Sequence, residues 1–100
     1  MELSVIICDD LAEERSQLCR FVQAYGQERG YRLRMEEAAG GEELLSRWRR
    51  DRWDLVLLDI YMPGLTGVET ARRLRMLDES CEIAFITTSE VHGLVGYDLG

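Results

Sequence analysis

The stretch DLVLLDIYMPGLTG, residues 54–67, decides the fold of this chain. Its first part is an uninterrupted apolar run, which is typical of a strand that is buried on both faces of a sheet. The run ends in a single carboxylate, Asp59, and the segment Met62-Pro63-Gly64 then predicts a tight turn. A helix is expected to follow over residues 67–78. The stretch therefore predicts a central strand over 54–59 with an acid at its tip.

The same alternation of strand and helix extends over the whole chain. Apolar or alternating runs predict further strands at 3–8, 31–38 and 81–87. Segments with helical spacing of apolar residues lie between them, at 9–30 and 40–51, and a fourth helix is expected over 90–99. Strict alternation with short connections implies a parallel sheet with helices on both faces. The fold class is therefore α/β, with a doubly wound parallel sheet.

Helical spacing also predicts which side chains of these helices face the sheet. The expected inward positions are Leu11, Leu18, Val22 and Tyr25 in the first helix, Leu44, Leu45 and Trp48 in the second, and Val68, Ala71, Leu74 and Leu77 in the third. Three arginines of the third helix, Arg72, Arg73 and Arg75, are expected to face outward. The arginines near Trp48 and Trp53, at the end of the second helix, are attributed to the helix dipole. The two tryptophans are attributed to packing at the core or its rim.

Length and composition restrict the class of protein. The chain has 100 residues, which suits one domain, and 46% of them are hydrophobic. Its net charge of −7 argues against binding nucleic acid or an anionic membrane by electrostatics. The three cysteines lack metal-binding spacing and are interpreted as buried apolar side chains in a reducing cytoplasm. With no signal peptide and no apolar run long enough to span a bilayer, a cytoplasmic location is expected.

Polar residues occur where three of the predicted strands end. Asp9 and Asp10 follow the first strand, Asp59 ends the third, and Thr87 and Thr88 end the fourth. In a parallel sheet these ends meet at one edge, where doubly wound folds bind their ligands. Clustered carboxylates suit Mg²⁺, and a carboxylate beside Mg²⁺ can act as the nucleophile toward a phosphoryl group. The backbone carbonyl of Tyr61, in the turn after Asp59, is a further candidate ligand.

Each residue also has a purely structural interpretation. Asp10 and Glu13 form the spacing of a capping box, which is compatible with a metal-binding role. Asp59 could start an Asx turn, Asp9 could be an ordinary loop residue, and the threonines could be β-formers at a strand end. Polar residues at all three strand ends are improbable as a coincidence, so the site remains the preferred interpretation.

These motifs resemble the receiver domain of two-component response regulators, over nearly the whole chain. The segments that carry the resemblance are IICDD at 6–10, LVLLDIYMPGLTG at 55–67 and IAFITT at 83–88. The resemblance implies a flavodoxin-like fold with strand order 2-1-3-4 and phosphorylation of Asp59 by a sensor histidine kinase. It also implies that Asp9, Asp10, Asp59 and the Tyr61 carbonyl hold Mg²⁺. Thr87 would be the hydroxyl that moves toward the phosphoryl group, with the Thr88 N–H beside it.

The C-terminal part of the chain gives two further expectations. The segment at 85–100 is similar to regulators with a LytTR-type DNA-binding output domain, which would be the partner of this domain. Family members carry a fifth strand, a lysine and a fifth helix beyond the match, so residues 1–100 are expected to be a C-terminally incomplete receiver domain. Without these elements the fourth strand would be an exposed edge, one sheet face would keep an apolar patch, and self-association is expected.

Three other functions compete with a phosphoacceptor switch. A Mg²⁺-dependent aspartyl-phosphate hydrolase would share the nucleophile but needs an acid two residues after it, where this chain has Tyr61. A pseudo-receiver without phosphotransfer is compatible with the missing lysine. A flavin-binding domain would need a phosphate-binding loop after the first strand, where Asp9 and Asp10 would repel phosphate. The expected role is a non-enzymatic switch with at most slow loss of its own phosphate.

Overall fold

A computed structural model describes residues 1–87 and the strand at 95–98, the latter by its backbone only. The element order is β1 (Glu2–Cys8), α1 (Ala12–Glu28), β2 (Arg32–Ala38), α2 (Gly41–Arg47), β3 (Leu55–Asp59), α3 (Gly67–Leu77), β4 (Glu82–Thr87) and β5 (Val95–Asp98). The sheet has the order β2-β1-β3-β4-β5, and the first four strands in this order are parallel. The predicted α/β class and the order 2-1-3-4 are confirmed.

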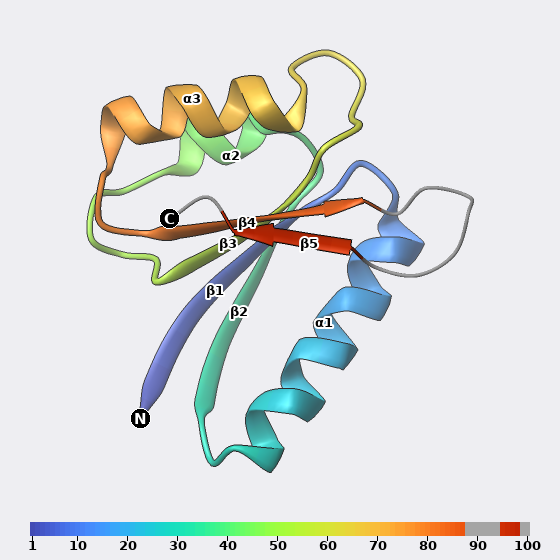
Figure 1. Ribbon diagram of the computed structural model, residues 1–100, viewed down its shortest axis with the longest axis vertical. Helices are drawn as coiled ribbons and strands as arrows, with labels where there is room; N and C mark the ends of the chain where they lie inside the picture. The colour runs from blue at the N-terminus through green and yellow to red at the C-terminus, as the bar shows by residue number, and fades with distance from the viewer. Residues whose placement is uncertain (88–94, 99–100) are drawn as a thin grey trace.

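The helices cover both faces of the sheet. Figure 1 shows α1 on one face and the neighbouring helices α2 and α3 on the other. Successive residues of β1 point to opposite faces, so Ile6 and Cys8 belong to the core under α2 and α3, while Val5 and Ile7 belong to the core under α1. This explains why β1 is apolar without interruption from Val5 to Cys8. None of the helices that the structure describes is long and apolar enough to cross a membrane.

The two cores are unequally closed. The core under α2 and α3 includes the fully buried Leu44 and Leu74, whereas α1 contributes one buried apolar side chain, Leu18. Two aromatic residues of α1 that follow it, Phe21 and Tyr25, remain 63% and 48% exposed. They line a groove of about 290 Å³ whose lining is apolar, formed by Leu18, Phe21, Val22, Tyr25, Leu55, Leu57 and Ile86. The expected apolar patch on one sheet face is therefore present.

Several helix predictions were wrong in detail. Helix α2 ends at Arg47, not at residue 51, because Trp48 has an extended backbone and Trp53 turns into the core at 5% exposure. On α1, Leu11 lies before the helix and is exposed, as is Tyr25. On α3, Val68 and Leu77 are exposed. Arg75 folds inward instead, and its guanidinium donates to the carbonyl of Cys81 at 2.7 Å.

The two tryptophans pack as expected, and their surroundings include a buried acid. Their ring centroids lie 6.2 Å apart. The indole N–H of Trp48 donates to Asp78 at 3.2 Å, and Asp78 also accepts bonds from the backbone N–H groups of Asp51 and Ser80. Asp78 therefore fastens the turn between α2 and β3 to the turn between α3 and β4.

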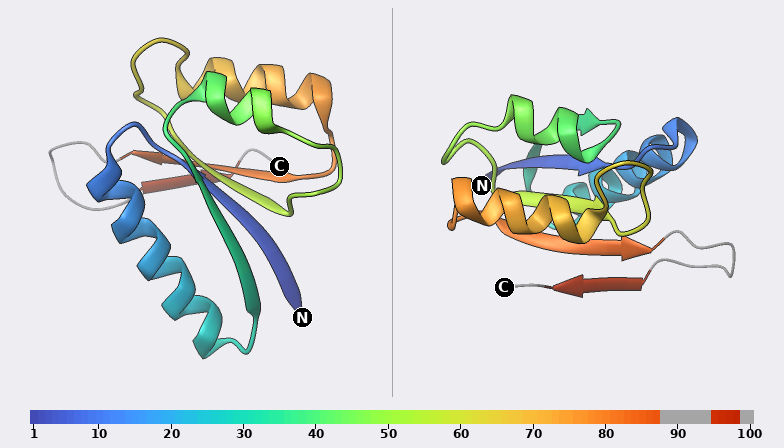
Figure 2. Two further views of the ribbon diagram at one scale, coloured as in Figure 1. Left: turned by 180° about the vertical axis from the view of Figure 1, so that it is seen from behind. Right: turned by 90° about the horizontal axis from the view of Figure 1, so that it is seen from above.

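The expected helix over 90–99 is not what the structure has at 95–98. These residues form β5, which pairs with β4 in antiparallel register, Thr87 opposite Val95 and Ala84 opposite Asp98 (Figure 2). The rest of the expected helix lies outside the described residues. The outer edge of β4 is therefore covered, and the expectation of an exposed edge was wrong. Pairing with β5 gives the backbone groups of β4 hydrogen-bond partners. This stabilisation favours a strand at 95–98 over the expected helix.

Candidate phosphoacceptor and metal site

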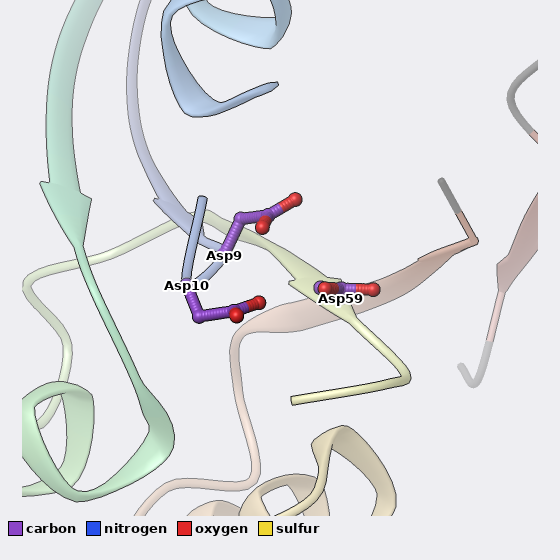
Figure 3. Close-up of side chains that lie close together, drawn as sticks. All are labelled: Asp9, Asp10 and Asp59. Atoms are coloured by element: carbon purple, nitrogen blue, oxygen red, sulfur yellow. The ribbon is translucent and has the colours of Figure 1, made fainter. Parts of the chain in front are cut away.

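Two neighbouring parallel strands end in the acids that form the site. Asp9 directly follows β1 and Asp59 is the last residue of β3, and these strands pair in parallel register from Val5–Leu55 to Cys8–Leu58. Asp10 follows in the turn before α1. One carboxylate oxygen from each of Asp9, Asp10 and Asp59 lies within 4.8 Å of the other two. Figure 3 shows the three side chains extending from the ends of β1 and β3 into one space.

Asp9 is held by two hydrogen bonds, but one oxygen of its carboxylate has no partner among the described residues. Its N–H donates to the carbonyl of Ala38 at the end of β2, at 3.1 Å. Its Oδ1 accepts a hydrogen bond from the N–H of Leu11 at 2.9 Å. Its side chain is fully buried, and Oδ2 has no hydrogen-bond partner among the residues that the structure describes. Such an atom costs about 1–3 kcal/mol unless a further group binds it.

Asp59 is placed by the turn that follows it. Its Oδ1 accepts a hydrogen bond from the N–H of Tyr61 at 3.2 Å, so the Asx turn that was an alternative interpretation is also present. The backbone after Asp59 is bonded to the neighbouring strand: the N–H of Ile60 donates to the carbonyl of Ile86 on β4 at 3.1 Å. The side chain of Asp59 is 4% exposed. The second oxygen of the carboxylate remains available for chemistry.

The turn after Asp59 depends on two glycines and a sulfur contact. Gly64 has φ of +74°, a conformation that other residues adopt with strain. A Cβ at Gly67 would collide with the backbone of Asp59, so only glycine allows α3 to start this close to the strand tip. Met62 is 6% exposed, and its sulfur accepts the thiol of Cys8 at 3.8 Å. The M-P-G-x-x-G pattern therefore fixes the loop beside the acid.

Burial dominates the electrostatics of the site. Burial raises the pKa of Asp9 to about 7, with the negative charges of Asp59, Glu14 and Asp10 adding to the effect. Burial likewise raises the pKa of Asp59, partly opposed by the N–H of Tyr61. Burial and the charge of Asp9 raise the pKa of the Cys8 thiol to about 12. The site therefore binds protons, or another cation, more readily than ordinary carboxylates do.

The donor set fits a hard divalent cation. It consists of oxygens only, and Mg²⁺ is bound in proteins by one or two carboxylates with several waters. The buried Oδ2 of Asp9, which lacks a partner among the described residues, is the kind of atom that a metal or its water would satisfy. The residues present therefore fit Mg²⁺.

The other predicted site residues are placed with less detail. Tyr61 lies in the turn after Asp59, and its side chain is 71% exposed, so only its backbone is a candidate ligand. Thr87 is the last residue of β4 and is half-buried, one position beyond the Ile86–Asp59 pair. Thr88 lies outside the described residues. The predicted capping box was wrong, because the N-cap of α1 is Leu11 and has no side-chain hydrogen bond.

Two residues near the site were missed from the sequence. Glu14, in the first turn of α1, raises the pKa of both Asp9 and Asp59, and its Oε2 is buried without a partner among the described residues. Its position in the first turn of the helix that follows Asp9 and Asp10 could have indicated this. Arg15 donates to the carbonyl of Asp9 at 2.7 Å and to Glu37 on β2 at 3.1 Å. It fastens the acidic turn to the neighbouring strand.

Comparison with curated proteins gives relatives whose names describe regulation and sensory transduction. The chain is 36% identical over 97 residues to the positive alginate biosynthesis regulatory protein of Pseudomonas aeruginosa, covering 97% of this chain and 38% of that protein. It is 29% identical over 101 residues to the sensory transduction protein LytT of Oceanobacillus iheyensis, covering 99% of this chain and 39% of that protein. The chain thus spans about two fifths of the length of these relatives.

Solved structures of a chemotaxis protein and of response regulators share the fold of this chain. The chemotaxis protein CheY4 of Vibrio cholerae matches with a TM-score of 0.74 and 27% identity, covering 89% of this chain and 71% of that one. A chain from the complex of histidine kinase ThkA with response regulator TrrA matches with a TM-score of 0.67 and 32% identity, covering 91% and 74%. TrrA from Thermotoga maritima in complex with Mg²⁺ and BeF matches with a TM-score of 0.60 and 28% identity, covering 88% and 71%.

A family model assigns the chain directly. The response regulator receiver domain matches residues 5–96, which include both acidic turns, the second half of β1 and all of β2, β3 and β4. The resemblance noted from the sequence is therefore confirmed, including its relation to a LytT protein. The chain belongs to the response regulator receiver domain family, the phosphoacceptor signalling domains of two-component systems.

Proposed function

We propose that Asp59 is the residue that accepts the phosphoryl group, and that Asp9 and Asp10 hold the Mg²⁺ that the transfer needs. The observation that supports this most directly is the convergence of three carboxylates within 4.8 Å at the ends of two parallel strands. Buried acids placed this close together repel one another unless a cation is bound. The similarity to TrrA, whose structure contains Mg²⁺ and BeF, agrees with this assignment.

The transfer is a displacement at phosphorus. The free oxygen of the Asp59 carboxylate attacks the phosphoryl group of a phosphohistidine or an acyl phosphate, and the bond from phosphorus to the donor nitrogen or oxygen breaks. The leaving group keeps the bonding electron pair. When bound, Mg²⁺ offsets the negative charge on the transferred oxygens. The Tyr61 carbonyl is proposed as a metal ligand, and the Thr87 hydroxyl and Thr88 N–H as donors to the phosphoryl oxygens.

Two of the competing functions need a structural feature that the site does not provide. A hydrolase of the aspartyl-phosphate type needs a general acid two residues after the nucleophile, but Tyr61 stands there and its side chain is exposed. A flavin site would require phosphate close to the buried acids at the end of β1. A pseudo-receiver remains the second candidate, and phosphorylation in vitro separates it from a true phosphoacceptor. Slow hydrolysis of the domain's own phosphate is part of the proposal.

The proposal extends to the partners of the domain. The phosphoryl donor would be a sensor histidine kinase, and the similarity to TrrA, which forms a complex with kinase ThkA, supports this. The output would be a DNA-binding domain of the LytTR type, as the likeness to LytT suggests, acting on transcription in the cytoplasm. Residues 1–100 would supply the receiver domain of such a regulator.

The proposal is tested by phosphorylation of the chain in vitro. Incubation with acetyl phosphate and Mg²⁺ should add one base-labile phosphoryl group, detected by intact-mass analysis, and EDTA should prevent it. Asp59→Asn should abolish the labelling, whereas Asp54→Asn, just before the opposite end of the same strand, should leave it intact. Labelling of Asp59→Asn at the wild-type level would refute the assignment. A folded wild-type protein that is never labelled would favour the pseudo-receiver.

A further inference from the structure

The connection between α2 and β3 carries a dense group of cations in an acidic protein. Residues 47–52, RWRRDR, contain four of the twelve basic residues of a chain whose net charge is −7. The helix dipole explains only one of them, because α2 ends at Arg47. Arg49, Arg50 and Arg52 lie beyond the helix, so they require another explanation.

Three of these arginines and both tryptophans of the chain surround one cavity. The cavity has a volume of about 600 Å³ and lies beside β2, one of the two edge strands of the sheet. Its lining consists of Glu36, Ser46, Arg47, Trp48, Arg49, Arg52 and Trp53. This volume is within the range of sites that bind small molecules, roughly 300–1,000 Å³.

Hydrogen-bond donors exceed acceptors in this cavity. The one carboxylate in the lining, Glu36, has both oxygens bound, one by Arg47 at 2.6 Å and the other by Arg52 at 3.4 Å. A guanidinium carries five N–H donors and no acceptor, so Arg52 retains several donors after this bond. The side chain of Arg49 makes no hydrogen bond or ion pair within the described part of the chain. The cavity therefore has an unfilled capacity to bind an anion.

The tryptophans add an aromatic wall to the cavity. Trp53 is 5% exposed, and its indole N–H has no acceptor among the described residues, whereas that of Trp48 is bound by Asp78. The guanidinium of Arg52 lies 5.3 Å from the centre of the Trp53 ring. Stacked arginine and tryptophan side chains are well suited to a planar group that carries negative charge.

We propose that this cavity binds a small organic anion, a carboxylate or a phosphate monoester attached to a flat apolar group. Arg49 and Arg52 donate to the anionic oxygens, and the tryptophan rings contact the apolar part. Glu36 competes with the ligand for the guanidinium of Arg52 and for part of that of Arg47, which also donates to Glu43 at 2.9 Å and to the Glu37 carbonyl at 2.7 Å. The site is formed by α2, β2 and the turn before β3, so it shares no residue with the acidic site at Asp9 and Asp59.

Binding is measured on the full chain, without Mg²⁺, with phenyl phosphate and benzoate as the two anionic probes. Benzyl alcohol tests the apolar contribution alone, and inorganic phosphate tests the charge alone. The chain has two tryptophans, so its NMR spectrum contains two indole N–H signals, and both belong to this cavity. Titration of these signals and of the backbone signals at 46–53 gives the affinity and the location together. The phosphorylation assay is separate and does not depend on the result.

Variants distinguish a binding site from packing. Arg49→Gln should weaken binding of the better anion at least about fivefold with no change in thermal stability, because its side chain has no hydrogen bond or ion pair within the described residues. Glu36→Gln should strengthen binding severalfold, since it removes the negative charge that competes for Arg52 and for one N–H group of Arg47, and a simple loss of structure could not produce this opposite sign. The matched control is Arg72→Gln with Arg73→Gln, two exposed arginines of α3, which should leave the affinity unchanged.

Three results would overturn the proposal. The first is equal binding of benzyl alcohol and phenyl phosphate, which would make the cavity merely apolar. The second is wild-type affinity in Arg49→Gln together with weaker binding in Glu36→Gln. The third is a set of signal changes spread over all arginine-bearing surfaces, including that of Arg72 and Arg73, which would show unspecific attraction of anions.

Discussion

At the scale of single residues, the ionised carboxylate of Asp9 makes an unfavourable contribution to the free energy of folding. Its side chain is fully buried and one oxygen lacks a partner among the described residues. Burial raises its pKa from 3.8 to about 7, so the folded state prefers the protonated acid while the unfolded state ionises near pH 4. This difference destabilises the folded protein as pH rises from about 4 to about 7, and the penalty is absent below about pH 4.

Asp9→Asn should therefore stabilise the metal-free protein at pH 7. The expected gain is about 1–3 kcal/mol, since each pKa unit is worth about 1.4 kcal/mol and the neighbouring acids share the effect. Thermal unfolding in EDTA at pH 4 and pH 7 measures it, and the gain should vanish at pH 4. Glu13→Gln, an exposed acid nearby, is the control. An Asp9→Asn protein that is less stable than wild type at pH 7 would contradict the prediction.

Asp10 is expected to affect metal binding and not the start of α1. The N-cap of that helix is Leu11, without a side-chain bond, so Asp10→Ala and Asp10→Asn should have similar stabilities in EDTA. Both should weaken Mg²⁺ binding by about tenfold or more, as measured by calorimetry. A loss of stability of about 1 kcal/mol in Asp10→Ala alone would instead indicate a capping role.

Glu14 is expected to modulate the site without belonging to the three-acid cluster. Its charge acts on Asp9 and Asp59, so Glu14→Gln should lower the pKa of both and weaken the attraction of the site for Mg²⁺ by a few-fold. Calorimetric titration with Mg²⁺ at pH 7 measures this. Glu14→Asp, which keeps the charge, should retain more of the affinity than Glu14→Gln does.

At the scale of elements, Asp78 connects two turns at the opposite end of the molecule from the acids. Burial alone raises its pKa, but hydrogen bonds from Ser80, the Asp51 N–H and Trp48 outweigh this and lower the pKa to about 2. A lowered pKa means that the acid stabilises the fold above about pH 4, and that this contribution is lost as pH falls toward 2. Ionisation of Asp78 therefore stabilises the folded protein, whereas ionisation of Asp9 destabilises it.

Asp78→Asn should destabilise the protein by about 2 kcal/mol at pH 7, because folding lowers the pKa of the acid from 3.8 to about 2. Urea unfolding at pH 7 and pH 3 measures the effect, and the difference from wild type should shrink at the lower pH. A constant difference at both pH values would indicate lost packing instead of lost charge.

The elements that could be predicted from sequence are those whose pattern and tertiary setting agree. The run before Asp59 is apolar throughout and is buried as a central strand, and the acids at the ends of β1 and β3 meet as expected. The segment at 95–98 was expected to be part of a helix but pairs with β4, since a strand edge offers backbone partners that no local pattern reveals. The exposure of Val68 and the inward turn of the half-buried Arg75 were missed for a related reason. Spacing defines a helix face, but only the neighbouring elements decide what covers it.

At the scale of the whole molecule, the apolar groove beside α1 predicts self-association of the chain. Phe21 and Tyr25 are substantially exposed there, and the groove lining is apolar. Sedimentation at increasing concentration should show association in the wild type and less of it in Phe21→Ser. If the strand edge were responsible instead, Phe21→Ser would associate like wild type, and removal of residues 95–100 would increase association strongly.

The thiol of Cys8 offers a kinetic measure of how often the phosphoacceptor end of the sheet opens. It is the last residue of β1, 1% exposed, and burial raises its pKa to about 12. An alkylating reagent can therefore reach and react with it only while the strand end is detached from Met62 and its neighbours. The half-buried Cys19 on α1 provides a reference for reagent and protein. The ratio of the two alkylation rates would follow the lifetime of the closed turn as ligands and phosphodonors are added.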